Sequence, residues 1–121
     1  MSYPTVDFTD ALGAGGASVS VPGGGTIRSG SVSQGGNPGL ITIEITVTTP
    51  LAAPPVINVY TPNGSGWSVW MSLEGQATVG TQVMTVVLGN KVIPFLVEVV
   101  NFDPANSFAV AAQWAGFTPG P

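Results

Sequence analysis

The sequence predicts an all-β protein, an antiparallel β-sandwich, and three observations carry this prediction. Short segments alternate apolar and polar residues with a period of two and are rich in β-branched side chains, as half-buried strands are. Glycine and proline, which number 17 and 11 among the 121 residues, separate these segments at close spacing. No stretch shows helical periodicity with caps. About seven to nine strands of this kind fit an immunoglobulin-like or a jelly-roll topology, and the pattern leaves that choice open.

The first third of the chain, residues 1–39, is rich in glycine. Strand candidates lie between the glycine clusters, at residues 5–9, 17–21 and 26–33. In the second of these, Val19 and Val21 alternate with serine. Two interpretations follow: an N-terminal arm that orders on a partner, or the first strands of the sandwich joined by glycine turns. The second is preferred.

The main sandwich is expected over residues 40–117, and its first strand has the clearest pattern. Ile41, Ile43, Ile45 and Val47 fall on one face, with Thr42, Glu44, Thr46 and Thr48 on the other. Prolines at positions 54 and 55 interrupt the chain, because proline cannot donate to a sheet ladder. Residues 56–61 read as the next strand, and residues 62–66 as the turn that closes it.

The strand after this turn is predicted to place alternate residues inward. The inward set is Trp67, Val69, Met71 and Leu73, and the outward set is Ser68, Trp70, Ser72 and Glu74. Residues 76–88 then give one strand, or two that are broken near Gly80.

The last part of the sandwich is predicted from one turn signal and one final strand. The dipeptide Gly89–Asn90 predicts a hairpin that pairs residues 83–88 with residues 91–100, and Pro94 indicates an edge position or a bulge there. Residues 107–117 form the final strand, with Trp114 expected in the core. A tail of residues 118–121 follows it.

The charge content excludes some partners and favours others. The formal net charge is −4, and Arg28 and Lys91 are the two basic residues. Neutralising a phosphate backbone or an anionic lipid surface requires clustered basic residues, so neither nucleic acid nor membrane is an expected partner. Only 7% of the residues are charged, against about 25% in ordinary globular proteins, which favours a protein that packs against partners.

Catalytic chemistry is not expected. The chain has no histidine and no cysteine, which removes the commonest general base, thiol nucleophiles and the usual nitrogen and sulfur metal ligands. Glu44, Glu74 and Glu98 each lie on a different predicted strand and are interpreted as single charges on solvent faces. Two of them acting as acid and base in a glycoside-acting enzyme is the remaining catalytic alternative. Asp7 and Asp10 lack the spacing of a calcium loop. No catalytic, metal or cofactor site is therefore predicted.

The aromatic residues give the best candidate for binding. Trp67 and Trp70 are three positions apart, so on a regular strand they point to opposite faces and one of them is exposed. An exposed Trp70 beside Asn63 and Ser68 would stack on a sugar ring or anchor a protein interface. The structural alternative is an edge tryptophan covered by the glycine-rich N-terminal segment.

In style, the sequence resembles the small capsid decoration (cement) proteins of tailed bacteriophages. The features are the glycine-rich first third, the Thr/Val strand of residues 41–49, the lack of Cys and His, the scarce charge and the proline-terminated end. The resemblance implies a jelly-roll-like homotrimer on the outer surface of the virion capsid, made in the host cytoplasm and bound to the major capsid protein or another virion protein. It also implies that the arm of residues 5–21 bridges capsid subunits. No single residue is carried over from the family; Tyr3, Val6 and Phe8 near the start of the chain are candidate binding residues, besides Trp70 and Asn63.

The main alternative function is a carbohydrate- or receptor-binding β module of a phage tail or fibre, which would use Trp70 and the loop of residues 62–66. The N-terminus lacks the basic and apolar segments of a signal peptide, so none is expected. No apolar stretch approaches the roughly 20 residues of a membrane-spanning helix.

Overall fold

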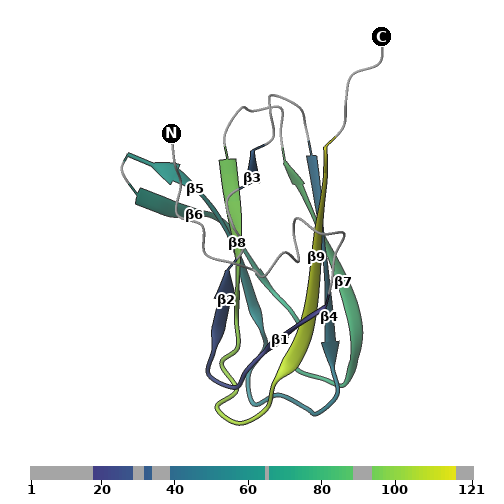
Figure 1. Cartoon of the computed structure of the whole chain (residues 1–121). Coiled ribbons are helices and arrows are strands. Elements are labelled where there is room, and N and C mark those ends of the chain that lie inside the picture. Colours follow the sequence, from purple (N-terminus) through teal and green to yellow (C-terminus); the bar gives the residue numbers. More distant parts are fainter. Residues whose placement is uncertain (1–17, 29–31, 34–38, 65, 89–93, 117–121) are drawn as a thin grey trace.

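The structure is a computed structural model, and it describes residues 18–28, 32–33, 39–64, 66–88 and 94–116 (Figure 1). Every regular element in these ranges is a β-strand. The strands are β1 (Val19–Val21), β2 (Thr26–Arg28), β3 (Val32–Ser33), β4 (Gly39–Val47), β5 (Val56–Asn63), β6 (Gly66–Glu74), β7 (Gly80–Leu88), β8 (Pro94–Val100) and β9 (Phe108–Gly116).

Two antiparallel sheets face each other as a β-sandwich (Figure 1). The first sheet has the order β1-β9-β4-β7. The second has the order β2-β8-β5-β6, and β3 pairs with the beginning of β8. The predicted all-β sandwich is confirmed.

The core lies between the two sheets and confirms the period-two pattern of β4. Ile41, Ile43 and Ile45 are fully buried, while Glu44 between them is exposed. From the opposite sheet, Ile57 and Val59 of β5 pack into the same cluster. The other members come from β1, the end of β4, β7, β8, β9 and one loop: Val21, Val47, Leu51, Val86, Phe95, Val97, Val99, Phe108, Val110 and Ala112.

The predicted hairpin between β7 and β8 is wrong. β7 pairs along its whole length with β4, from Gly39↔Leu88 to Val47↔Gly80, whereas β8 pairs with β5 and β2 in the other sheet. The Gly89–Asn90 signal is local, and the nine-position pairing with β4 is a larger and long-range interaction that decides where β7 lies. Residues 89–93 lie outside the described part of the chain.

Pro94 was interpreted as lying at an edge position or a bulge; β8 lies between β5 and β2 farther along, but its pairing with β5 ends at Leu96, so Pro94 pairs on the β3 side alone. Pro94 is the first residue of β8, a position where the missing N–H removes no interior ladder bond. Residues 76–88 were expected to form one strand, or two broken near Gly80; the structure has one strand, β7, which begins only at Gly80 after an irregular segment.

The glycine-rich first third supplies strands to both sheets. β1 pairs with β9 in the first sheet and places Val21 in the core, and β2 pairs with β8 in the second. Between them Gly24 has a φ of 69° in a turn closed by the hydrogen bond from Gly25 N to Pro22 O, a conformation that favours glycine. Residues 19–21 therefore belong to the sandwich and not to a bridging arm. The expected strand at residues 5–9 lies outside the described residues.

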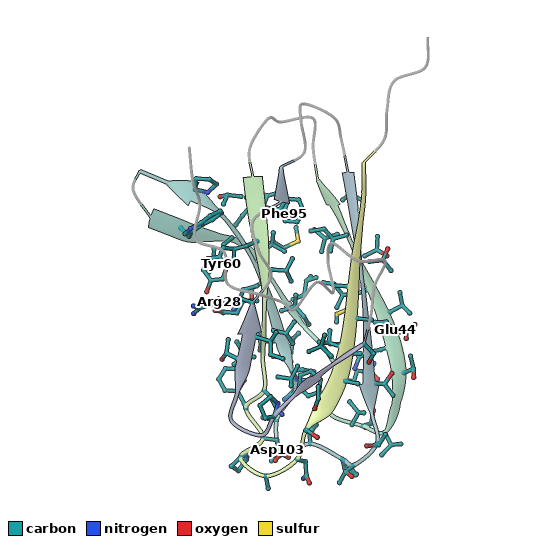
Figure 2. The ribbon with its side chains drawn as sticks, viewed as in Figure 1. Arg28, Glu44, Tyr60, Phe95 and Asp103 are labelled. Carbon is teal, nitrogen blue, oxygen red and sulfur yellow. The ribbon has the colours of Figure 1, made fainter. Side chains whose placement is uncertain are left out.

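Two buried polar residues fix the loops at one end of the sandwich, where Figure 2 labels Asp103. The side-chain amide of Asn101 donates to the carbonyls of Val21, Pro22 and Asn106. The carboxylate of Asp103 accepts from the backbone N–H groups of Ala52, Ala105 and Asn106, each at 2.7 Å. These hydrogen bonds lower the pKa of Asp103 to about 2. Phe102, between the two anchors, is 57% exposed.

Candidate functional site

The outer face of the second sheet gathers the polar and aromatic side chains that are candidates for binding. On β5, Ile57 and Val59 point into the core, so Asn58 and Tyr60 point outward. On β8 the same alternation turns Glu98 outward between the buried Val97 and Val99. Figure 2 shows Tyr60 and Arg28 on the side of the molecule away from the first sheet and Glu44 on the opposite side.

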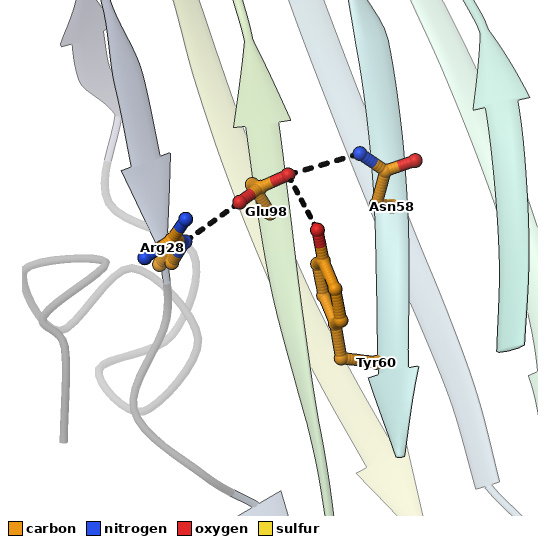
Figure 3. A network of polar contacts seen from close by, with 4 residues as sticks. All are labelled: Arg28, Asn58, Tyr60 and Glu98. Atoms are coloured by element: carbon orange, nitrogen blue, oxygen red, sulfur yellow. Dashed lines mark hydrogen bonds and ion pairs between the residues drawn. The ribbon is translucent and has the colours of Figure 1, made fainter. Parts of the chain in front are cut away.

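Glu98 is the centre of a hydrogen-bond network that joins three strands (Figure 3). Its Oε2 accepts from Nε of Arg28 at 2.6 Å, and its Oε1 accepts from Nδ2 of Asn58 and from the hydroxyl of Tyr60, each at 3.0 Å. The hydroxyl of Ser72 on β6 extends the network by donating to Oδ1 of Asn58 at 2.8 Å. A chain of contacts therefore runs across the sheet from β2 to β6.

The network buries the carboxylate and leaves its cationic partner half in water. The side chain of Glu98 is 6% exposed, against 49% for Arg28. Burial alone would raise the pKa of Glu98, but the hydrogen bonds from Asn58, Arg28 and Tyr60, with the charge of Arg28, outweigh it and lower the pKa. Glu98 is therefore ionised at neutral pH. Burial, together with the bond to Glu98 and its negative charge, raises the pKa of Tyr60 despite the opposing charge of Arg28.

A β-bulge sets the direction of the aromatic side chains beside this network. Val59 pairs with Met71 but the next residue, Tyr60, pairs with Val69, so Trp70 is the extra residue of the bulge. Trp70 is 45% exposed and Val69 is 50% exposed. The predicted exposure of Trp70 is confirmed, and the predicted inward direction of Val69 is wrong because the bulge shifts the alternation by one residue.

The same shift changes the prediction for Trp67. Trp67 pairs with Pro62, two positions beyond Tyr60 on β5, which places it on the same side of the hairpin as Tyr60. It is half-buried, and it is not among the partly buried residues that pack against the core. Trp67 and Trp70 therefore do not point to opposite faces. Met71 and Leu73 do pack against the core, as predicted.

The hairpin of β5 and β6 extends this surface beyond the sandwich. Figure 1 shows its tip bending away from the body of the molecule. Gly64 at the tip has a φ of 62°, which a glycine adopts without strain. The outer face of the second sheet and the outward side of this hairpin therefore form one continuous surface.

The structure describes only some of the predicted binding residues. Trp70 lies on β6 between Ser72, which bonds Asn58, and Val69, which pairs with Tyr60. Asn63 is the last residue of β5, and its side chain lies outside the described part. Tyr3, Val6 and Phe8 lie outside the described residues. The side chain of Trp114, expected in the core, is likewise not described.

The prediction for the three glutamates holds for two of them. Glu44 and Glu74 are exposed, but Glu98 is buried and hydrogen-bonded, so its interpretation as a solvent-facing charge is wrong. Its partners Arg28, Asn58 and Tyr60 were not singled out from the sequence. The sequence has only eight charged residues, and Arg28 and Glu98 are two of them. Their contact depends on the register between β2 and β8, which neighbouring residues in the sequence do not predict.

Within the described ranges, no three His, Cys, Asp or Glu side chains come together as a metal site would require. None of the elements described is a helix that could cross a membrane.

Comparison with known proteins shows a similarity of fold to solved structures. No family model and no curated protein sequence matches the chain. Among solved structures, one titled "CBM4 structure and function" matches with a TM-score of 0.52 and 12% sequence identity, over 93% of this chain and 88% of that one. The class of fold is thus a β-sandwich of the jelly-roll kind. The matched structure is that of a carbohydrate-binding module, and the likeness is one of fold.

Proposed function

We propose that the chain is a carbohydrate-binding β module that holds an oligosaccharide on the outer face of the second sheet and does not cleave it. The observation that carries the proposal is the position of Trp70 and Tyr60 beside the network of Arg28, Asn58 and Glu98 on one face. The similarity to a carbohydrate-binding module supports it at the level of fold.

The chemistry of this face suits a sugar. The apolar face of a pyranose ring packs on an aromatic side chain, and its hydroxyl groups need fixed donors and acceptors around the ring. Trp70 supplies an exposed ring. Arg28 has two further guanidinium nitrogens besides the Nε that bonds Glu98, and about half of its side chain is exposed. Donors held this way lose little conformational entropy on binding.

Glu98 supports binding more than it supports hydrolysis. A general acid must hold a proton near neutral pH, whereas the hydrogen bonds to Glu98 lower its pKa. Both of its oxygens already accept bonds from protein groups. Its role in the proposal is to orient Arg28, Asn58 and Tyr60 toward the ligand.

A pair of tryptophan and phenylalanine variants tests the proposal. Binding partners are first sought by screening neutral and acidic oligosaccharides, and affinity is measured by titration calorimetry. Trp70→Ala should lower the affinity at least about tenfold, since a buried aromatic anchor contributes well over 1.4 kcal/mol. Phe102→Ala is the matched control, because Phe102 is a similarly exposed aromatic on a loop, and it should leave affinity unchanged. Equal effects of the two changes, or no binding to any glycan, would contradict the proposal.

A structural role in a virion is the second candidate, and one observation favours it. The outer face of the first sheet carries few charges: its described side chains are mostly Thr, Val and Ala, with Glu44 as the acid on β4. Such a face suits packing in an assembly. Capsid-surface binding, a trimer, and a place on a phage tail or fibre remain predictions. Co-sedimentation with assembled capsids would support the capsid role.

A further inference from the structure

The four sheet edges of the described structure differ in how they are protected. Natural proteins guard edge strands by keeping them short or by placing charges, prolines or bulges on them. β1, β2 and β3 are two or three residues long, and β6 carries a bulge and Glu74. β7 has none of these devices. It runs for nine residues as Gly-Thr-Gln-Val-Met-Thr-Val-Val-Leu, without charge, proline or bulge.

β7 also exposes apolar side chains. Within the described part of the chain it pairs with β4 alone, so the backbone groups of its other side have no ladder partner there. On the outer face of the first sheet, Val83 is 60% exposed and Val87 is 65% exposed. An edge of this kind is a template for another strand.

We propose that β7 is a dimerisation edge, on which β7 of a second copy of this chain pairs antiparallel about a twofold axis at Met84. This register pairs all nine residues, because Met84 is the middle residue of Gly80–Leu88. On the outward side it places Val83 opposite Thr85 and Val87 opposite Thr81, each twice. β-branched residues facing one another across strands stabilise a sheet.

The charges of the molecule allow this pairing. The nearest acid on that face is Glu44, which lies on β4 opposite Val83. In the dimer the order would be β4-β7-β7-β4, and the two Glu44 residues would also be offset by two residues along the strands, so they would be about 16 Å apart at a strand spacing of about 4.8 Å. That exceeds the screening length of about 8 Å at physiological salt. β7 carries no basic residue that would attract an acidic partner protein. A second copy of β7 is itself uncharged, so no charge repulsion opposes the pairing of the two strands.

The dimer would have a functional consequence. Paired residues of neighbouring strands point to the same face of a sheet, so the twofold axis is perpendicular to the first sheet. Both second sheets then lie on the same side of the joined first sheets, and their outer faces point in one direction. Two weak sites that face one polymer or surface gain affinity by acting together. The nature of that ligand rests on the proposed function, but the dimer itself does not.

Lysine variants test the register. Val83→Lys with Thr85→Lys puts two lysines opposite two lysines in the dimer, whereas both positions are exposed in the single chain. Val83→Lys with Thr85→Glu is the matched control, since it puts each lysine opposite a glutamate. By light scattering after size exclusion, the natural chain should have about twice the 12.2 kDa of one chain. The double lysine variant should raise the dissociation constant at least about tenfold and the control should not.

Single cysteines give a second measurement that also detects a weak dimer. The chain has no cysteine of its own. Met84→Cys would face its own copy across the axis at about 5 Å between Cα atoms, within disulfide range. Val87→Cys is more exposed, yet its two copies would be about 20 Å apart along the strands. Oxidation should therefore cross-link the first variant and not the second.

The outcomes separate the proposals. Cross-linking at position 84 but not at 87 supports the dimer whether or not any glycan binds. Equal cross-linking of both variants, a trimer mass, or a dimer that the double lysine variant leaves intact would overturn it. Glycan binding by a protein that never dimerises would leave the proposed function standing and remove this inference.

Discussion

Replacing Glu98 with glutamine tests whether the network on the outer face of the second sheet contributes to stability. Glutamine keeps one oxygen to accept from Asn58 and Tyr60 but presents an N–H group to the Nε donor of Arg28. Losing the bond to a half-exposed arginine costs about 1 kcal/mol. Changing the other two bonds from a charged to a neutral acceptor costs about 1 kcal/mol more. We therefore expect Glu98→Gln to lower the free energy of unfolding by about 2 kcal/mol.

The assay is urea unfolding followed by tryptophan fluorescence. Glu44→Gln, on the exposed outer face of the first sheet, is the matched control and should change stability by less than about 0.5 kcal/mol. The lowered pKa of Glu98 means that its contribution is present above its unfolded value near 4.5 and is lost as pH falls through the folded value. The difference between the natural chain and Glu98→Gln should therefore shrink in acid. An unchanged midpoint at neutral pH would refute the network as a source of stability.

Two further predictions concern the core and the loops. Ile43 is fully buried, so Ile43→Ala should lower the free energy of unfolding by about 2–5 kcal/mol in the same assay. Ile43→Asp should leave the chain unfolded, as measured by circular dichroism. A folded aspartate variant would show that Ile43 does not point into the core. The pKa of Asp103 is lowered to about 2, so Asp103→Asn should be less stable than the natural chain above about pH 4. The difference in stability should shrink as pH falls toward 2. A difference that does not change with pH would show that it does not come from the charge of Asp103.

The fold could be predicted because its signal is repeated along the chain. β4 shows this best, since Ile41, Ile43 and Ile45 alternate with polar residues and all three are buried. Where the structure departs from the prediction, a long-range interaction outweighs a local signal. The Gly89–Asn90 turn signal predicted a hairpin, but pairing of β7 with β4 over nine positions places the next strand in the other sheet.

The candidate site could be predicted only in part. The exposure of Trp70 followed from alternation, but the bulge in β6 turned Val69 outward and could not be predicted from single residues. Glu98 and Arg28 are 70 positions apart and meet because β2 pairs with β8. That register depends on the whole second sheet, so neither residue could be assigned from its neighbours in the sequence.

The ion pair of Arg28 and Glu98 allows stability to be separated from binding. Removing one partner of a buried pair is costly because the other stays unpaired, whereas replacing both by apolar residues is often neutral. Arg28→Leu with Glu98→Leu leaves no charge unpaired but removes the acceptor of Asn58 and Tyr60, so it should cost no more than the roughly 2 kcal/mol expected for Glu98→Gln. If the network exists to position ligand-binding groups, the double variant should still lose glycan affinity, because Asn58 and Tyr60 are no longer held. A double variant that is stable and binds as well as the natural chain would show that the network is structural, and would leave Trp70 to account for binding without it.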